Sequence, residues 1–135
     1  VFIDGIDEVT DLLARSPSIA DAVEAIALNA AVVGGDGHSD YGRAFLGFHR
    51  RFARSIGPRT NLIVLGDARN NYHRPEAWVL ADLHRRARKV IWLNPEPRAY
   101  WGSGDSIMGQ YAPHCDGVFE CRNLRQLRAF VDELA

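Results

Sequence analysis

Two polar segments of the sequence hold the residues best suited to bind a ligand. In the first, Ser39 and Asp40 follow a glycine-rich stretch and directly precede a predicted helix. Hydroxyl oxygens and backbone N–H groups at a helix start can hold an anion or join the oxygen shell of a cation. In the second, Asp67 follows an apolar run, where its carboxylate can meet a hard cation or a ligand hydroxyl. Helix or turn capping is the alternative role for each of these residues.

Histidines in the same two segments offer a second chemistry. His38 or His73 could act as a general base with Asp67, which would make the chain a small α/β hydrolase or phosphotransferase. No combination of nucleophile, base and orienting group is found, and the sequence has no G-x-S-x-G motif. These two segments contain no third histidine, and the sequence has no i, i+4 histidine pair that would support a transition-metal site. The enzyme is therefore the rival hypothesis and not the leading one.

The remaining reactive residues have simpler interpretations. Cys115 and Cys121 lack C-x-x-C spacing and are expected to be ordinary reduced thiols. Reduced thiols and the lack of a visible signal peptide favour the cytoplasm. The arginine pairs Arg50-Arg51 and Arg85-Arg86 are expected on solvated helix faces, with a protein-contact or phosphate-binding role left open.

Length and composition predict one globular domain over residues 1–135. The sequence has 135 residues, of which 47% are hydrophobic and 24% are charged, with a formal net charge of -1. This balance excludes a strongly basic domain that binds nucleic acid or membranes over its whole surface. No apolar run approaches the roughly 20 residues of a membrane-spanning helix. Because the sequence opens at Val1 inside an expected strand, we expect it to be a piece of a longer protein.

The elements that must position these residues alternate between strands and helices. Apolar runs predict an N-terminal hairpin over residues 1–13 and buried strands over 61–65, 90–93 and 118–121. Helical spacing predicts helices over residues 16–31, 41–56, 75–88 (with Trp78 on the buried side) and 124–134, and one helical turn at 107–111. This alternation predicts an α/β fold with a doubly wound, mostly parallel open sheet and helices on both faces. Ligands of such sheets bind at the carboxyl ends of the strands, so the loops at 34–39 and 66–71 should meet there.

Taken together with their strands, the two loops resemble the von Willebrand factor A (VWA) domain, and more narrowly the CoxE-like branch of bacterial VWA proteins. The most specific part is Trp92-Leu93-Asn94-Pro95-Glu96-Pro97. The matching segments are residues 35–42, 62–67, 90–96, 101–106 and 123–127. The resemblance covers essentially the whole chain and implies the VWA form of the α/β fold.

The resemblance implies a metal-ion-dependent adhesion site built from three loops. Ser39 stands at the position of the family's threonine, and Asp67 stands at the position of its third-loop aspartate. The family's first motif, Asp-x-Ser-x-Ser, has no counterpart, so the chain resembles the C-terminal part of the domain without its first strand. Mg²⁺ needs near-octahedral oxygen coordination. We therefore expect weak or no Mg²⁺ binding by Ser39 and Asp67 alone.

The resemblance also implies a function as a protein–protein interaction module without catalytic activity. The expected partners are a MoxR-type ATPase and a client metalloenzyme, with no nucleic acid and no membrane span. A metal-free scaffold is the third hypothesis. Because the missing strand would lie in the middle of the sheet, we also expect an exposed edge. That edge favours a dimer or strand complementation by another chain.

Overall fold

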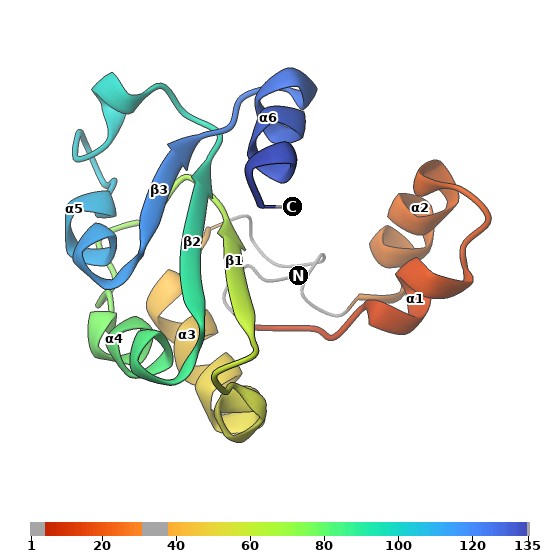
Figure 1. The fold of residues 1–135 in the computed structure, drawn as a ribbon, viewed down its shortest axis with the longest axis horizontal. Coiled ribbons are helices and arrows are strands. Elements are labelled where there is room, and N and C mark those ends of the chain that lie inside the picture. Colours follow the sequence, from red (N-terminus) through yellow and green to blue (C-terminus); the bar gives the residue numbers. More distant parts are fainter. Residues whose placement is uncertain (1–4, 31–37, 135) are drawn as a thin grey trace.

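The sheet at the centre of the protein has three parallel strands. A computed structural model describes residues 5–30 and 38–134 (Figure 1). Its strands are β1 (Asn61–Leu65), β2 (Lys89–Asn94) and β3 (Gly117–Glu120), in the order β1-β2-β3. In the register, Ile63 pairs with Ile91, which in turn pairs with Gly117. All three predicted strands of the sheet are confirmed, while the strand expected at residues 1–4 lies outside the described residues.

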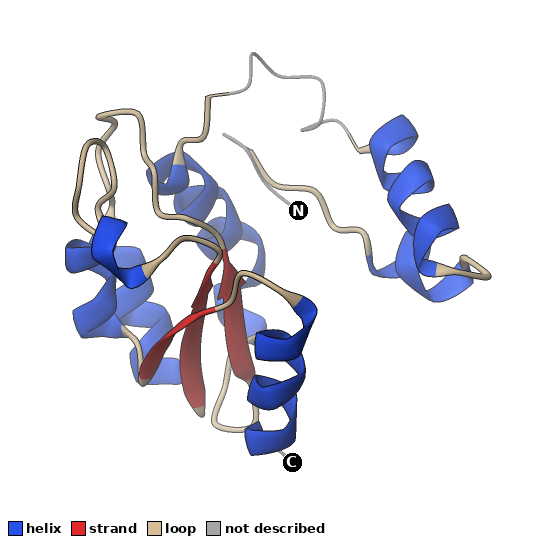
Figure 2. Cartoon of the chain, turned by 90° about the horizontal axis from the view of Figure 1, so that it is seen from above, coloured by secondary structure: helices blue, strands red, loops and turns tan. Residues whose placement is uncertain are grey.

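Helices cover both faces of this sheet, as the alternation of elements predicted. On one face lie α3 (Tyr41–Phe52), α4 (Ala77–Arg86) and the short α5 (Met108–Tyr111). They bury Val90 and Trp92 of the central strand. On the other face, α6 (Leu124–Leu134) covers Ile91 and Leu93 through Phe130 (Figure 2). Both faces of β2 are covered, and its residues Val90–Leu93 are accordingly all apolar and buried.

Short 3₁₀ turns and helix caps set the ends of these elements. The turns span Ala53–Ser55, Arg98–Tyr100 and Ala112–His114. The side chain of Asp40 caps α3 by accepting from Arg43 N over 2.8 Å. Asn123 Oδ1 accepts from Gln126 N over 3.0 Å and caps α6 in the same way. Both helices therefore begin where the sequence predicted.

The N-terminal part differs from its prediction. Residues 6–13 were expected to form a strand, but α1 (Thr10–Arg15) occupies their second half. Local interactions explain the helix, because the Glu8 carboxylate accepts from Thr10 N over 2.8 Å and Asp11 lies 3.7 Å from Arg15 one turn later. The predicted helix that follows is confirmed as α2 (Ile19–Asn29), with Ser18 as its cap. Figure 1 shows this helix pair beside the sheet and not on it.

Two apolar surfaces stay open. Trp78 of α4, predicted to face the core, is 53% exposed, because Val79, Leu80 and Leu83 supply the buried side of that helix. Within the described residues, β1 pairs with β2 along one edge and with no strand along the other. Its side chains Ile63 and Leu65 are 38% and 61% exposed.

None of the helices in the described ranges is both long and apolar enough to cross a bilayer.

Candidate functional site

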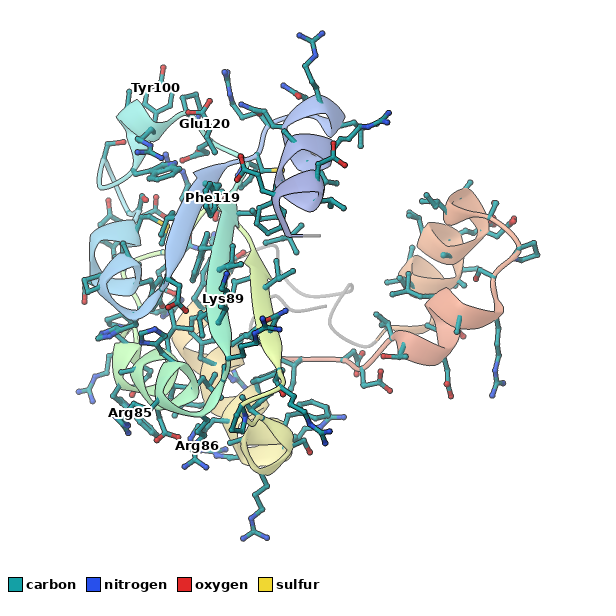
Figure 3. All side chains as sticks on the ribbon, viewed as in Figure 1. Arg85, Arg86, Lys89, Tyr100, Phe119 and Glu120 are labelled. Atoms are coloured by element: carbon teal, nitrogen blue, oxygen red, sulfur yellow. The ribbon has the colours of Figure 1, made fainter. Side chains whose placement is uncertain are left out.

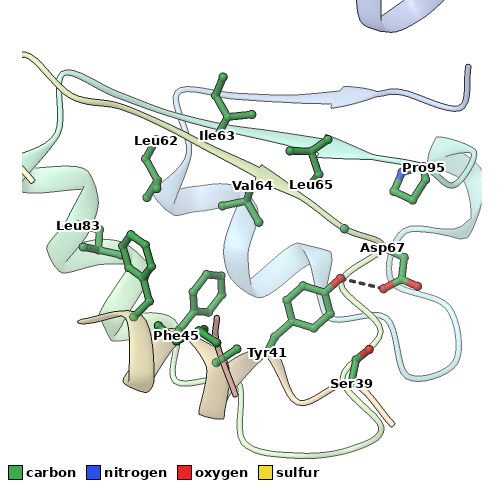
Figure 4. Close-up of a pocket in the computed structure, with 14 residues that line it drawn as sticks. Ser39, Tyr41, Phe45, Leu62, Ile63, Val64, Leu65, Asp67, Leu83 and Pro95 are labelled. Carbon is green, nitrogen blue, oxygen red and sulfur yellow. Dashed lines mark hydrogen bonds between the residues drawn. The ribbon is translucent and has the colours of Figure 1, made fainter. Parts of the chain in front are cut away.

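A groove of about 600 Å³ follows the open edge of β1 (Figure 4). Apolar side chains line most of it, including Leu62, Phe45 and Leu83. Its polar end lies where β1 finishes, and there Ser39 and Asp67 both contribute to the lining. The structure therefore brings together the two residues that the sequence selected. It does so at the carboxyl edge of the sheet, where ligands of open α/β sheets bind.

The Asp67 carboxylate is held in a fixed orientation. Its Oδ1 atom accepts from the Tyr41 hydroxyl over 3.0 Å and from Arg69 N over 2.9 Å. The Tyr41 oxygen in turn accepts from Ala68 N over 3.1 Å. No hydrogen bond to Oδ2 of Asp67 is found among the described residues. One carboxylate oxygen thus anchors the side chain, while the other has no hydrogen bond within the described part of the chain.

Tyr41 reaches Asp67 because the backbone at Gly66 leaves room for its ring. A Cβ atom at residue 66 would overlap the Tyr41 hydroxyl, so this position requires glycine. The Tyr41 ring stacks on Trp92, with centroids 5.7 Å apart, and Trp92 stacks on Tyr111 at 5.1 Å. Burial, together with the nearby Asp67 charge, raises the pKa of Tyr41 above its usual value. The phenol therefore stays protonated at neutral pH and acts as a hydrogen-bond donor.

Two asparagines join the loop that precedes α3 to the loop that follows β1. Asn70 is fully buried, and its Oδ1 accepts from Tyr41 N over 2.7 Å. Its Nδ2 donates to the His73 carbonyl over 2.7 Å. Asn71 Nδ2 donates to the Ser39 carbonyl over 2.9 Å. These contacts place Ser39 beside the end of β1. Sequence reasoning treated both asparagines only as part of a polar loop.

An ion-pair cluster fixes the other side of the same loop. Arg69 binds both carboxylate oxygens of Glu96, at 2.8 and 3.0 Å, and Oδ1 of Asp105 at 2.9 Å. Asp105 Oδ2 also accepts from Asn71 N over 3.1 Å. The hydrogen bond from Arg69 is the main reason why the pKa of Asp105 lies below its usual value. The loop after β1 is therefore tied to the loop after β2, and Arg69 is fully engaged in this contact.

Two further candidate residues, Asp40 and His73, contact each other. His73 Nδ1 is 3.8 Å from Asp40 Oδ2, and the His73 side chain is 49% exposed. His38 is exposed. Asp40 caps α3, which is the alternative to ligand binding that the sequence left open. The contact with Asp40 gives no support to a base formed by His73 and Asp67.

The metal prediction remains a prediction. Within the described ranges, no group of three or more His, Cys, Asp and Glu side chains could hold a metal ion. The hydroxyl of Ser39 and the carboxylate of Asp67 are oxygen donors of the kind that Mg²⁺ prefers. As two donors they fit the ion in kind but are too few to hold it alone.

The two cysteines are free, as expected. Burial raises the pKa of Cys115 to about 12, so its thiol stays protonated at neutral pH. A protonated thiol is a poor nucleophile and a poor metal ligand. Cys115 therefore has a packing role on the α5 side of the core.

Comparison with known proteins identifies a family. A family model described as "VWA domain containing CoxE-like protein" matches residues 1–130. No curated protein and no solved structure matches the chain. The match spans the three strands of the sheet, the groove and both loops at its polar end.

Proposed function

The chain belongs to the family of VWA domain containing CoxE-like proteins, and from this premise we propose that it is an interaction module whose partner binds at the Asp67 end of the groove. The observation that carries the proposal is the shared position of Ser39 and Asp67 in the lining of one open groove. An open groove suits a protein partner better than it suits chemistry that must exclude water.

A divalent cation is the second part of the proposal. Ser39 and Asp67 would supply two oxygen ligands to Mg²⁺, and the ion's charge would favour a carboxylate from the partner as a further ligand. The remaining ligands would come from a strand added along β1, at the place where the family carries its Asp-x-Ser-x-Ser motif. The alternative is a metal-free scaffold, which would bind its partner without Mg²⁺.

The open edge of β1 supports the added strand. Arg88 N donates to the Thr60 carbonyl, and Gly66 N donates to the Leu93 carbonyl. Because backbone groups alternate along a strand, those of Ile63 and Leu65 point away from β2, into the groove. A parallel strand on this edge would end beside Asp67. Another chain, a second copy or another part of the same protein could supply it.

The partner that we propose is a MoxR-type ATPase, with a client metalloenzyme whose maturation or metal insertion the pair assists in the cytoplasm. No catalytic role is proposed for the chain. The family match and the absence of a membrane-spanning helix among the described helices are compatible with this role.

The experiment compares binding of a purified MoxR-type ATPase in Mg²⁺ and in EDTA. For the intact protein, we expect Asp67→Ala to weaken binding in Mg²⁺ about ten-fold or more, the cost of losing a charged ligand. Asp11→Ala, at an exposed carboxylate of α1, is the matched control. Binding that is equal in EDTA and unaffected by Asp67→Ala would refute the cation-dependent site. Calorimetric titration of the intact protein with Mg²⁺ separates that site from a metal-free scaffold.

A further inference from the structure

The arginine pairs of the sequence gather at the end of the sheet opposite Asp67. Arg50 and Arg51 belong to the last turn of α3, and Arg85 and Arg86 to the last turn of α4. Both helices run antiparallel to the strands and finish at the amino-terminal edge of the sheet (Figure 3). This end of the molecule is separate from the groove's polar end, which lies where the strands finish.

Backbone contacts bring the connecting segments to the same place. Arg88 N donates to the Thr60 carbonyl over 2.8 Å, which joins the turn before β2 to the loop before β1. Lys89 is in register with Asn61. The segments 50–60 and 83–89 therefore meet at this end of the sheet, and we call them together the basic edge. Its cations are Arg50, Arg51, Arg54, Arg59, Arg85, Arg86, Arg88 and Lys89.

The basic edge carries more positive than negative charge. Asp116 is a carboxylate on its Lys89 side, 3.3 Å from His84. Glu8 lies on its Arg51 side. Neither segment contains Asp or Glu. The nearest carboxylate in sequence, Asp82, is already bound to Arg86 at 2.6 Å, Arg85 at 2.7 Å and His49 at 2.9 Å. These hydrogen bonds, that of Arg86 first, lower the pKa of Asp82 well below its usual range. Asp82 thus has little capacity left for further cations.

Four exposed arginines of the basic edge have no ion pair within the described part of the chain. They are Arg50, Arg54, Arg59 and Arg88. Favourable interaction with a helix dipole explains basic residues in the last turn of a helix. This effect accounts for Arg50 but not for the other three, which lie beyond the ends of α3 and α4. Their mutual repulsion is a cost that binding of an anionic partner would relieve.

We propose that the basic edge binds an acidic segment of a protein partner, independently of Asp67. Guanidinium groups bind carboxylates through two parallel hydrogen bonds, which suits a run of Asp and Glu. Single-stranded nucleic acid is less well matched because it stacks its bases on exposed aromatic rings. The exposed aromatic residues of the described chain are Tyr72, Trp78, Tyr100 and Phe119, and none belongs to the basic edge. With one binding site at each end of its sheet, the module would hold two partners at once.

Fluorescence anisotropy with a labelled deca-glutamate peptide tests this proposal at low salt. We expect Arg54→Ala/Arg59→Ala to weaken binding about five-fold or more, at roughly 0.5 kcal/mol or more for each lost pair. The matched control is Arg125→Ala/Arg128→Ala, which removes the same charge from exposed positions of α6. We expect the control to stay close to wild type. Arg54→Lys/Arg59→Lys should fall in between, because lysine keeps the charge and loses the forked geometry.

Three results would overturn the proposal. The first is undetectable binding of the peptide by the wild-type protein at low salt. The second is equal weakening by the edge variant and by the α6 control, which would indicate a general charge effect. The third is tighter binding of a single-stranded oligonucleotide of the same length through the same arginines, which would assign the surface to nucleic acid. Asp67→Ala should leave peptide binding unchanged, so the test does not depend on the groove.

Discussion

The Tyr41 hydroxyl and the Asp67 carboxylate are hydrogen-bonded over 3.0 Å, although 26 residues separate them in the sequence. The contact links the first residue of α3 to the end of β1. It fixes the carboxylate from one side only and leaves the groove side open. The Asp67 carboxylate is therefore held rigidly by Tyr41 and still faces the groove.

Tyr41→Phe tests how much this link contributes. The change leaves Ala68 N without its acceptor and takes one donor from Asp67, so we expect a loss of about 1–2 kcal/mol in the free energy of unfolding. Urea denaturation measures it. Tyr100→Phe is the control, because Tyr100 is 55% exposed, and its effect should stay within about 0.5 kcal/mol. Equal effects of the two variants would show that the hydroxyl contact is not stabilising.

Asn70→Ala should be more damaging than any exposed asparagine substitution. The variant leaves Tyr41 N and the His73 carbonyl without their side-chain partner, at an expected cost of about 2–3 kcal/mol. Thermal unfolding followed by circular dichroism reports the loss. Asn29→Ala, at an exposed position of α2, provides the comparison. A melting temperature unchanged from wild type would mean that the loop after β1 does not depend on Asn70.

The ion pair of Arg69 with Asp105 predicts that the stability of the fold depends on pH. The pKa of Asp105 is lower in the folded protein than in the unfolded chain, mainly through the hydrogen bond from Arg69. Its contribution is therefore present above the unfolded pKa of about 4 and is lost as the pH falls through the folded value. Urea midpoints of wild type and Asp105→Asn should differ at pH 7 and converge in acid. A difference that persists unchanged to the lowest pH at which the protein folds would contradict this linkage.

The open edge of β1 predicts self-association of the chain at high concentration. Ile63→Lys puts a charge at an exposed position of the strand edge that has no strand partner among the described residues, where lysine opposes edge-to-edge pairing. Sedimentation velocity should show a larger monomer fraction for this variant than for wild type. Leu124→Lys changes an 82% exposed apolar residue of α6 and should leave the distribution as it was. Purely monomeric wild type at every concentration would remove the basis for this prediction.

Local sequence patterns were sufficient for the sheet and for its polar end. Apolar runs identified the three strands, and the rule that ligands bind at the carboxyl ends of parallel strands selected Ser39 and Asp67, which line one groove. The contacts that hold them could not be predicted, because Tyr41 meets Asn70 and Asp67 only after the chain has folded. Two local predictions were wrong for similar reasons. Residues 10–15 have apolar spacing compatible with either element type, and the exposure of Trp78 depends on how α4 packs.

The stacked indole of Trp92 gives the groove a natural optical reporter. Its Nε1 donates to the Gly66 carbonyl over 2.7 Å, one residue before Asp67, and the side chain is fully buried. Trp78, by contrast, emits from a mostly aqueous environment. Of the three tryptophans, Trp92 is the one that is fully buried, whereas Trp101 is half-buried. Because polarity sets the emission wavelength of indole, we expect the bluest component of the spectrum to come from Trp92. A movement of that loop on binding of the proposed partner would therefore change the emission of Trp92 without any added label.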